Sequence, residues 1–373
     1  MLYIFFLITF IYSALIVAFI IGYEKIEPVE NKSTLPKNSF SILIPFRNEA
    51  ENLPQLLESL LRLEYPLDLF EILFIDDAST DNSKEIIEKF KLGKTNKIIE
   101  NIRRSNSPKK DAIETAIHQS KYDWILTTDA DCKIPKNWLL EFDNFLQQND
   151  SKMVCAPVTY TVNNSLLQQF QLLDFMSLIG VTIGGFGIGK PFLCNGANLC
   201  YSKKVFLEVD GFNGNNKIAS GDDIFLLEKI TNKYPSQVHY LKSSEAIVTT
   251  IPQPTLNELV SQRLRWASKT SSYDNWFVKL IGITVFLMNL SVLFLFIIML
   301  FKTEYTIPFI AIFSIKFFLD FIIIYKTLIF TKQSKNIIFY PFSTLFYPFF
   351  NVFIVLLTFI KKKYHWKDRY FNT

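Results

Sequence analysis

Six carboxylates whose spacing could support chemistry occur in this chain as three pairs. They are Asp76 and Asp77, Asp129 and Asp131, and Asp222 and Asp223. The first two pairs directly follow short apolar runs, and the third opens a predicted helix. Carboxylates at such places can bind nucleoside hydroxyls, hold a hard divalent cation or take a proton from a hydroxyl group. The pairs therefore predict a site that combines a nucleotide, a metal and a general base.

Asp129 and Asp131 flank a single alanine directly after the apolar run WILTT. Two carboxylates at this spacing can share Mg²⁺ or Mn²⁺, with diphosphate oxygens and waters completing the coordination shell. The ion would act as a Lewis acid that neutralises a leaving diphosphate. The motif also occurs by chance, and its position at the end of a predicted strand favours the functional interpretation.

Asp76 and Asp77 follow the apolar run EILFI. The simple alternative is that acidic and hydroxyl side chains here cap the next helix. Capping explains Asp81 or Ser79, but it does not explain two adjacent acids at the end of a strand. A carboxylate at this place can accept a hydrogen bond from a uracil imide or a ribose hydroxyl. The pair is therefore a candidate nucleoside-binding site, with helix capping as the open alternative.

Asp222 and Asp223 follow Gly221 at the start of a predicted helix. Helix capping is again the alternative, and Asp222 could satisfy it. Asp223 would then be available as a general base, which must reach an acceptor hydroxyl and be ionised near neutral pH. A nearby divalent cation favours the ionised form.

Gln262, Arg265 and Trp266 share one face of a later predicted helix, because they are spaced i, i+3, i+4. An arginine can pair with diphosphate oxygens in a fork. A tryptophan offers a flat apolar wall for an acceptor sugar or lipid. The alternative for Trp266 is an interfacial anchor beside a membrane span.

Two further segments could line the same site. Asn195 and Gly196 belong to a small polar loop that could face a donor or an acceptor pocket. Lys109 and Lys110 open a predicted helix, where their ammonium groups could approach a phosphate. For both segments, a plain turn or a solvated helix start explains the residues equally well.

The central part of the chain alternates short apolar runs with amphipathic stretches. Runs at 40–46, 71–75 and 124–128 predict strands, and the stretches 51–63 and 109–119 predict helices. This βαβ rhythm predicts a parallel, doubly wound sheet. Nucleotides bind at the carboxyl ends of the strands in such sheets, which is where the first two acidic pairs fall.

Strongly apolar segments stand at both ends of the chain. Residues 2–23 carry no charge and are about long enough for one membrane span. They lack the basic start and the cleavage site of a signal peptide, which favours an uncleaved anchor. Residues 280–301, 306–330 and 337–360 predict two or three further spans.

Charges complicate this membrane plan. Lys316 and Asp320 fall inside a predicted span, and bare charges at that depth are costly, so we expect them to pair. The tail 361–373 is strongly basic and should be cytoplasmic. One N-terminal and three C-terminal spans would instead place it on the side opposite the central domain. Either the last segment is re-entrant or interfacial, or the charge rule fails.

The composition argues against some classes of protein. The net charge of +4 is small, and no basic patch interleaved with aromatic residues predicts nucleic-acid binding. The cysteines form no CxxC pair, which fits ordinary free thiols in a reducing compartment. They are Cys132, Cys155, Cys194 and Cys200.

Taken in order, these motifs resemble those of a membrane-bound family 2 glycosyltransferase with a GT-A fold, similar to cellulose and hyaluronan synthases and ceramide glucosyltransferase. The segments that carry the resemblance are SILIPFRNEAENLPQLLESL, EILFIDDASTDNS, TTDADCKIPKNWL, CNGANLCYSKKVF, ASGDDIFLLEKI and QRLRWASK. The resemblance implies an α/β GT-A domain with a doubly wound mixed sheet, flanked by transmembrane helices. The implied parts are an anchor at 1–23, a linker at 24–39, the catalytic domain at 40–276, a transmembrane region at 277–360 and a basic tail at 361–373.

The same resemblance implies a role for each candidate residue. Asp77, with Asp76, would bind the nucleoside, and Asp129 and Asp131 would bind the nucleotide and the metal. Asp223 would be the catalytic base. The end of the site that receives the acceptor and the diphosphate would be lined by Gln262, Arg265 and Trp266. Asp131 is the more direct metal ligand of its pair. The base motif reads GDD where related synthases often have TED or GED, so Asp222 stays open as the base.

The implied activity is inverting transfer of a sugar from a nucleotide-diphosphate sugar, a UDP-sugar, to a lipid or glycan acceptor at the membrane. Few spans remain to build a polymer channel, so a single transfer is expected over processive polysaccharide synthesis. A nucleotidyl or phosphoryl transferase would share the Asp-X-Asp site, but the chain lacks a Gly-rich phosphate loop. A non-catalytic membrane scaffold is the third class. The implied location is the inner (plasma) membrane, with several spans and a cytoplasmic catalytic domain.

Overall fold

The computed structural model describes residues 2–29, 35–90, 96–215, 218, 220–268, 275–361, 363–366 and 369–372. The chain divides into two compact units, and each is described by itself. The α/β unit consists of Glu27–Thr161 and Pro191–Ile251. The helical unit consists of Met1–Ile26, Val162–Lys190 and Pro252–Thr373.

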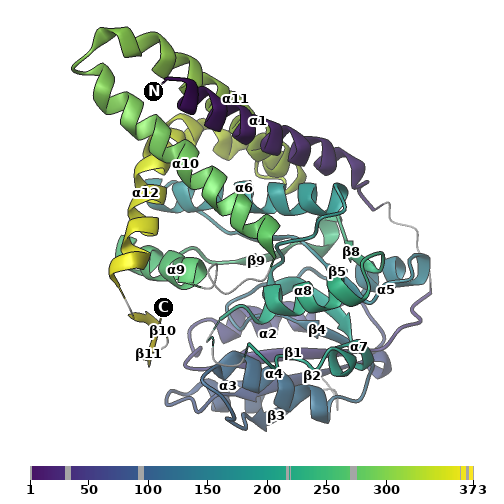
Figure 1. Ribbon diagram of the computed structural model, residues 1–373. Helices are drawn as coiled ribbons and strands as arrows, with labels where there is room; N and C mark the ends of the chain where they lie inside the picture. The colour runs from purple at the N-terminus through teal and green to yellow at the C-terminus, as the bar shows by residue number, and fades with distance from the viewer. Residues whose placement is uncertain are drawn as a thin grey trace. The chain divides into compact units, whose positions relative to one another are not determined.

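Within the described residues, a seven-stranded mixed sheet forms the centre of the α/β unit (Figure 1). In sheet order its strands are β3 (Asn96–Glu100), β2 (Phe70–Asp76), β1 (Phe40–Phe46), β4 (Trp124–Thr127), β7 (Leu199–Ser202), β5 (Met153–Cys155) and β8 (Val238–Tyr240). β1 is parallel to both β2 and β4, whereas β7 is antiparallel to both of its neighbours. The mixed sheet that the family resemblance implied is confirmed, whereas the wholly parallel sheet that the βαβ rhythm predicted is wrong, because β7 enters antiparallel between β4 and β5.

Helices and a small second sheet complete the α/β unit. The helices are α2 (Leu53–Leu61), α3 (Ser83–Lys89), α4 (Pro108–Gln119), α5 (Trp138–Gln148), α7 (Lys203–Glu208) and α8 (Asp222–Lys233), and β6 (Val158–Tyr160) pairs with β9 (Val248–Thr250). α4 packs against β1 and β2. Ile42, Leu43 and Ile44 in β1 are fully buried. A central strand covered on both faces must be apolar along its length, which explains the run FSILIPF.

The order of the strands positions the predicted site. β1 lies between β2 and β4, and the three strands are parallel, so their carboxyl ends meet at one edge of the sheet. The segments that follow β2 and β4 begin with Asp77 and Thr128-Asp129. Two acidic motifs that are about fifty residues apart in sequence are therefore brought to the same edge.

The helical unit contains the apolar segments from both ends of the chain. Its helices are α1 (Leu2–Lys25), α6 (Leu166–Gly187), α9 (Leu256–Ser268), α10 (Trp276–Met299), α11 (Thr306–Phe330) and α12 (Tyr340–Ile360). In the described part of the chain, all of them except α9 are long and apolar enough to cross a membrane. The prediction of apolar helices at both termini is confirmed.

α6 is an apolar helix that the sequence patterns did not single out. Its most apolar window has a mean hydropathy of 1.4, against 2.8 for α1, because polar side chains interrupt it. That window is 72% buried, whereas the windows of the other four helices are between 22% and 33% buried. α6 is therefore mostly enclosed by protein, while the others leave most of their surface exposed.

Glycines allow α6 to approach α1 closely. A Cβ atom added at Gly184 would lie 2.4 Å from the carbonyl oxygen of Phe19, and one added at Gly187 would lie 1.8 Å from that of Gly22. Any larger residue at either position would push backbone against backbone. The end of α1 is in this way held tightly against α6.

The compact units do not follow the expected catalytic boundaries of 40–276. α6 and α9 fall inside that range, yet they pack with the C-terminal helices. Phe170 and Leu259 share one buried cluster with Phe350 and Ile354 of α12. The physical reason is that both helices bury apolar faces against α12. The range 40–276 as a functional domain stays a prediction.

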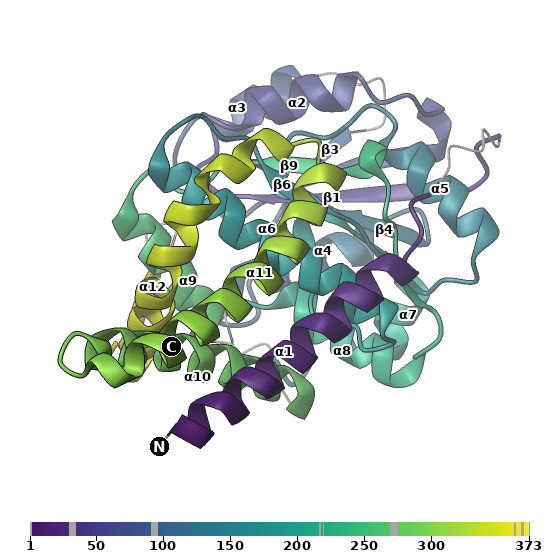
Figure 2. The ribbon, with the colours of Figure 1, turned by 90° about the horizontal axis from the view of Figure 1, so that it is seen from above.

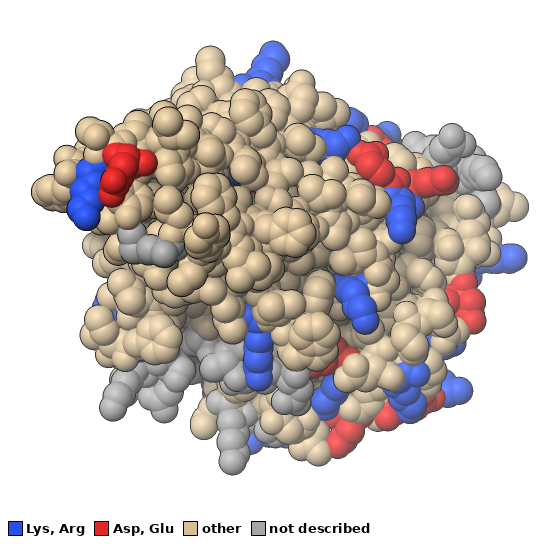
Figure 3. Space-filling model, turned by 45° about the horizontal axis from the view of Figure 1, so that its top comes forward, with Lys and Arg blue, Asp and Glu red and all other residues tan. Residues whose placement is uncertain are grey.

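α1, α10 and α11 pack against one another (Figure 2). Phe5 stacks on Phe294 and Phe19 lies edge-on to Phe277, so α1 and α10 run antiparallel. Figure 3 shows a broad surface of this unit with few charged side chains. Exposed apolar residues on these helices include Tyr3, Phe6, Phe10, Leu290, Phe294, Ile297, Ile310 and Phe318.

Lys316 and Asp320 form an ion pair within α11, as predicted. The Tyr12 hydroxyl of α1 donates a hydrogen bond to the same carboxylate. The Lys316 ammonium also lies 5.4 Å from the ring centroids of both Tyr12 and Tyr347. The pair and its hydrogen bond to Tyr12 therefore link α1 to α11 through polar contacts in apolar surroundings.

The C-terminal tail forms an antiparallel hairpin of β10 (Lys363–Trp366) and β11 (Arg369–Asn372). β10 packs near α9, which belongs to the same unit. Lys362 and Lys367 of the predicted basic tail lie outside the described residues. The side of the membrane on which the tail lies stays a prediction.

Candidate functional site

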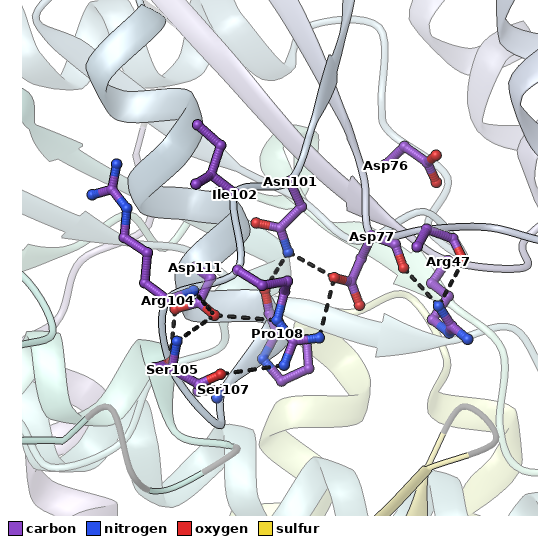
Figure 4. A network of polar contacts seen from close by, with 12 residues as sticks. Arg47, Asp76, Asp77, Asn101, Ile102, Arg104, Ser105, Ser107, Pro108 and Asp111 are labelled. Carbon is purple, nitrogen blue, oxygen red and sulfur yellow. Dashed lines mark hydrogen bonds and ion pairs between the residues drawn. The ribbon is translucent and has the colours of Figure 1, made fainter.

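The carboxyl ends of β1 and β2 form one corner of the site (Figure 4). The backbone N–H of Asp77 donates to the carbonyl oxygen of Phe46 over 3.0 Å. The Arg47 guanidinium donates to the carbonyl oxygens of Asp77 and Ala78, each over 2.7 Å. Ala78 has a φ of 57°, a conformation that residues other than glycine rarely adopt. Arg47 thus fixes the strained turn that carries Asp77.

The adjacent acids Asp76 and Asp77 have different partners. Asp77 accepts a hydrogen bond from the Asn101 side-chain amide over 2.7 Å and lies 3.5 Å from the Arg103 guanidinium. Asp76 accepts a hydrogen bond from the backbone N–H of Ser79 over 2.9 Å, a contact within the turn that precedes α3 and not a helix cap, and it lies 3.9 Å from the Lys84 ammonium of α3. Asp77 instead contacts the segment that follows β3 (Figure 4).

Asp111 is a buried acid that sequence reasoning did not select. It accepts hydrogen bonds from the backbone N–H groups of Arg104 and Ser105, each over 3.0 Å, and from the Ser105 hydroxyl over 2.7 Å. The Arg103 guanidinium donates to it over 3.2 Å. These contacts fix the loop that presents Asn101 to Asp77. The one signal in the sequence is an acid in the first turn of a helix.

Lys109 lies among the carboxylates of two separate motifs. Its ammonium is 2.6 Å from Asp129 and 3.4 Å from Asp222. Burial opposes the charge on Lys109, but the carboxylates of Asp129, Asp222 and Asp223 outweigh burial and raise its pKa above the ordinary value. One cation therefore joins the Asp-X-Asp motif to the predicted base motif.

Lys110, predicted together with Lys109, is held elsewhere. Its ammonium donates to the carbonyl oxygens of Asn215 and Ile218 over 2.7 and 3.0 Å. It also lies 4.8 Å from the ring centroid of Phe225. Adjacent helical residues point about 100° apart, so only one of the two lysines can face the acids. The structure brings Lys109, and not Lys110, to the carboxylates.

Because β4 and β7 are neighbours in the sheet, Gly196 lies next to Asp222 and Asp223, the candidate general bases. Thr127 donates from its hydroxyl to the Gly196 carbonyl over 2.7 Å. The N–H of Gly196 donates to one carboxylate oxygen of Asp223 over 3.3 Å, and the N–H of Ile224 donates to the other over 2.8 Å. A Cβ atom at Gly196 would lie only 3.1 Å from Asp222. Two backbone donors thus hold the Asp223 carboxylate beside this glycine.

The two asparagines of the same loop stabilise its shape. Asn195 accepts a hydrogen bond within the turn that it opens. The Asn198 amide donates to the carbonyl oxygens of Pro157 and Ala246 over 2.7 and 2.8 Å, and its oxygen accepts from the Trp138 indole over 2.8 Å. Asn198 is fully buried. It fixes the loop that carries Gly196, a role that the sequence did not reveal.

The Asp-X-Asp pair suits a magnesium or manganese ion. Asp129 and Asp131 supply the hard oxygen ligands that these ions prefer. In the described ranges, no three His, Cys, Asp or Glu side chains group closely enough to form a complete protein-made metal site. Two carboxylates are a donor set that fits such an ion.

Gln262, Arg265 and Trp266 lie on α9 in the helical unit. The Trp266 ring lies 6.4 Å from that of Phe175 on α6. Arg263, which stands between the predicted residues, is buried and makes an ion pair with Asp174 of α6 over 2.7 Å. The helical spacing i, i+3, i+4 passes over Arg263, so the sequence pattern gave no signal for this residue.

Family models match most of the chain. Residues 124–329, more than half of it, match glycosyl transferase family group 2, and residues 41–203 match glycosyl transferase family 2. The chain therefore belongs to the family 2 glycosyltransferases. This confirms the resemblance that the acidic motifs indicated.

Curated relatives are similar at a lower level. The chain is 26% identical over 246 residues to the poly-β-1,6-N-acetyl-D-glucosamine synthase of Staphylococcus epidermidis, which covers 64% of this chain and 57% of the relative. It is 25% identical over 237 residues to the glycosyltransferase AglE of Haloferax volcanii, which covers 62% of this chain and 72% of the relative. The chain thus spans little more than half the length of the synthase.

A solved structure shares the fold over nearly the whole chain. It is the mannosyltransferase PcManGT of Pyrobaculum calidifontis, solved in complex with GDP-mannose and Mn²⁺. The match covers 91% of this chain and 95% of that chain, with a TM-score of 0.53 and 14% identity. At that identity the likeness concerns the fold alone, and it agrees with the mixed sheet described above.

Proposed function

We propose that this protein is an inverting glycosyltransferase that moves a sugar from a nucleotide-diphosphate sugar to a lipid or glycan acceptor at the membrane. The observation that carries the proposal is the position of Lys109 between Asp129 and Asp222, beside Asp223. A diphosphate-binding group, metal-binding acids and a general base are what sugar transfer from such a donor requires.

The proposed binding site for the donor lies at the edge of the sheet where β2 and β4 end, at Asp77 and at the Asp129 and Asp131 pair. Asp77 would accept from the base or ribose of the nucleoside, and we propose uridine as that nucleoside. Lys109 would contact the diphosphate. Asp129 and Asp131, with Asp131 the more direct ligand, would hold Mg²⁺ or Mn²⁺, which would supply Lewis-acid stabilisation of the leaving group.

Asp223 would carry out the proton transfer. Its carboxylate takes the proton of the acceptor hydroxyl as that oxygen attacks the anomeric carbon from the side opposite the diphosphate. The new glycosidic bond forms as the bond to the diphosphate breaks, so the configuration inverts. The backbone donors at Gly196 and Ile224 orient the carboxylate for this step. Asp222, paired with Lys109, is better placed as a holding group than as the base.

Gln262, Arg265 and Trp266 would line the acceptor and diphosphate end. We propose a single transfer per encounter, because few helices remain for a polymer channel. Processive synthesis is the second candidate, favoured by the similarity to a polysaccharide synthase. We further place the protein in the inner (plasma) membrane with the α/β unit in the cytoplasm, in line with its apolar helices.

The test is release of UDP by the purified full chain in nanodiscs. UDP-sugars are screened with Mg²⁺ or Mn²⁺ and membrane lipid extract, with Asp223→Asn as the matched control. We expect one donor to give lipid-stimulated UDP release that the variant lacks. Release of pyrophosphate instead would identify a nucleotidyl transferase. Long products at low turnover would show processive synthesis, and no release with any donor would contradict the proposal.

A further inference from the structure

Arg263 contacts two of the three residues proposed for the acceptor end. Its guanidinium carbon lies 4.2 Å from the ring centroid of Trp266. Its Nη1 group donates a hydrogen bond to the Gln262 side-chain oxygen. One planar cation therefore fixes the position of the tryptophan ring and of the amide at the same time.

The opposite edge of the same guanidinium is anchored on α6. Its Nε and Nη2 atoms lie 2.9 and 2.7 Å from one carboxylate oxygen of Asp174. The side chains of Arg263 and Asp174 are 8% and 7% exposed. The pair is thus almost fully removed from solvent, and it links α9 to α6 at the level of Trp266.

Stability alone is a weak reason for such a pair. Removing two charges from water costs several kcal/mol per ion, and apolar residues of similar volume often replace buried pairs without loss. An apolar side chain could also cover Trp266. It could not donate to Gln262, because that contact needs a guanidinium or another fixed donor. The geometry therefore favours a role in orienting side chains over a role in packing.

We propose that Arg263 is a positioning residue, anchored by Asp174, which sets the orientation of Gln262 and Trp266 for the acceptor. This inference rests on the proposed transferase function. Because an arginine only donates, the Gln262 oxygen is engaged and its N–H₂ group is the part directed to a ligand. α6, which sequence patterns did not single out, is on this account a functional part of the enzyme.

The helical unit offers a matched control. Lys316 and Asp320 form a second ion pair, with side chains 4% and 16% exposed, and their contacts run to Tyr12 and Tyr347. Breaking either pair leaves a largely buried charge without its partner, and the cost in stability is similar. Only Arg263 of the first pair contacts Gln262 and Trp266 directly, so Asp320→Asn controls for general loss of folding.

The experiment compares Arg263→Met, Asp174→Asn, the exchange Arg263→Asp with Asp174→Arg, and Asp320→Asn. The full chain in nanodiscs is used throughout. Three quantities are measured: the apparent KM and kcat for added membrane lipid extract as the acceptor source at saturating donor, the Kd of UDP with Mn²⁺, and the Trp266 emission obtained by subtracting the spectrum of the same protein with Trp266→Phe. Thermal stability is recorded for each variant.

We expect Arg263→Met to lower kcat/KM for the acceptor by about 10- to 100-fold and to change the Trp266 emission, with the UDP Kd within about twofold. The exchange should recover thermal stability by restoring the pair, but not acceptor kinetics, since a carboxylate at position 263 cannot donate to Gln262. Recovery of both, or an Arg263→Met profile equal to that of Asp320→Asn, would overturn the inference. If the wild type releases no UDP, the function proposal fails, while the Trp266 emission still reports on Arg263.

Discussion

Lys109 in the α/β unit and Arg263 in the helical unit are both cations held by carboxylates, but their charge balance differs. Lys109 lies near Asp129, Asp222 and Asp223, so acids outnumber the cation. Arg263 faces one described acid, Asp174, and the pair is neutral. A surplus of negative charge must be offset by something that binds, whereas a balanced pair needs no ligand.

This contrast separates two kinds of charged cluster. The cluster around Lys109 carries a net negative charge, which fits the proposed divalent cation, and that cation would in turn attract the proposed diphosphate. The pair of Arg263 and Asp174 carries no net charge, which fits the proposed positioning role. Both clusters contain buried ions, and they differ in net charge. We interpret the negative cluster around Lys109 as a binding site and the neutral pair of Arg263 and Asp174 as a group that orients its neighbours.

Removal of the proposed base should have the largest effect. Asp223→Asn keeps the size of the side chain and one of its two backbone contacts, because an amide NH₂ cannot accept a hydrogen bond. It also cannot take the proton, so we expect kcat to fall by about 10²- to 10⁴-fold. The Kd of UDP, measured by calorimetry, should stay within about twofold. Asp222→Asn serves as the comparison. If that variant loses more turnover than Asp223→Asn, the base is Asp222.

Loss of a metal ligand should come next. Asp131→Ala removes one oxygen ligand, and we expect the apparent Mn²⁺ affinity in the presence of UDP to fall by about 10- to 100-fold. UDP binding is titrated with Mn²⁺ and again after chelation with EDTA. Chelation should weaken UDP binding to the wild type and have little effect on the variant. Equal metal dependence in the two proteins would remove Asp131 from the ligand set.

Neutralisation of Lys109 tests the surplus of acids directly. Lys109→Met leaves Asp129 and Asp222 without their cation, so we expect UDP affinity to fall by about tenfold, the value of one charge-assisted hydrogen bond. Lys136→Met, which breaks an exposed pair with Glu64, is the surface control. An unchanged UDP Kd in Lys109→Met would show that this lysine does not contact the diphosphate.

The smallest effect on activity is expected at the balanced pair of α11. Lys316→Met with Asp320→Asn removes both charges together, so no buried ion is left alone and the cost in stability should be small. The kcat/KM of the folded protein should stay within about twofold. Thermal unfolding in nanodiscs and the UDP-release assay measure the two quantities. A large selective loss of acceptor turnover would mean that this pair also belongs to the acceptor end.

Much of the fold was predictable from local patterns, while one helix was not. Apolar runs that end in acids predicted strands at 40–46 and 71–75, because a strand buried on both faces must be apolar throughout. α6 escaped prediction because Asp174 and neighbouring glutamines lower its hydropathy. Asp174 is tolerated there because it pairs with Arg263 of α9, and Gln171 bonds to the backbone of Gln253. Partners so distant in sequence cannot be read from a local window.

The sequence by itself determined the family, the mixed α/β architecture, the apolar ends and the types of residue at the site. These depend on local composition and on the order of motifs. Only the tertiary structure decided the partners of each pair: Asp77 contacts Asn101 and Arg103, and Lys109 rather than Lys110 meets the carboxylates. It also decided that Asp111, Asn198 and Arg263 support their neighbours. The reason is that side-chain direction and charge balance arise from contacts between segments distant in sequence, which local patterns do not encode.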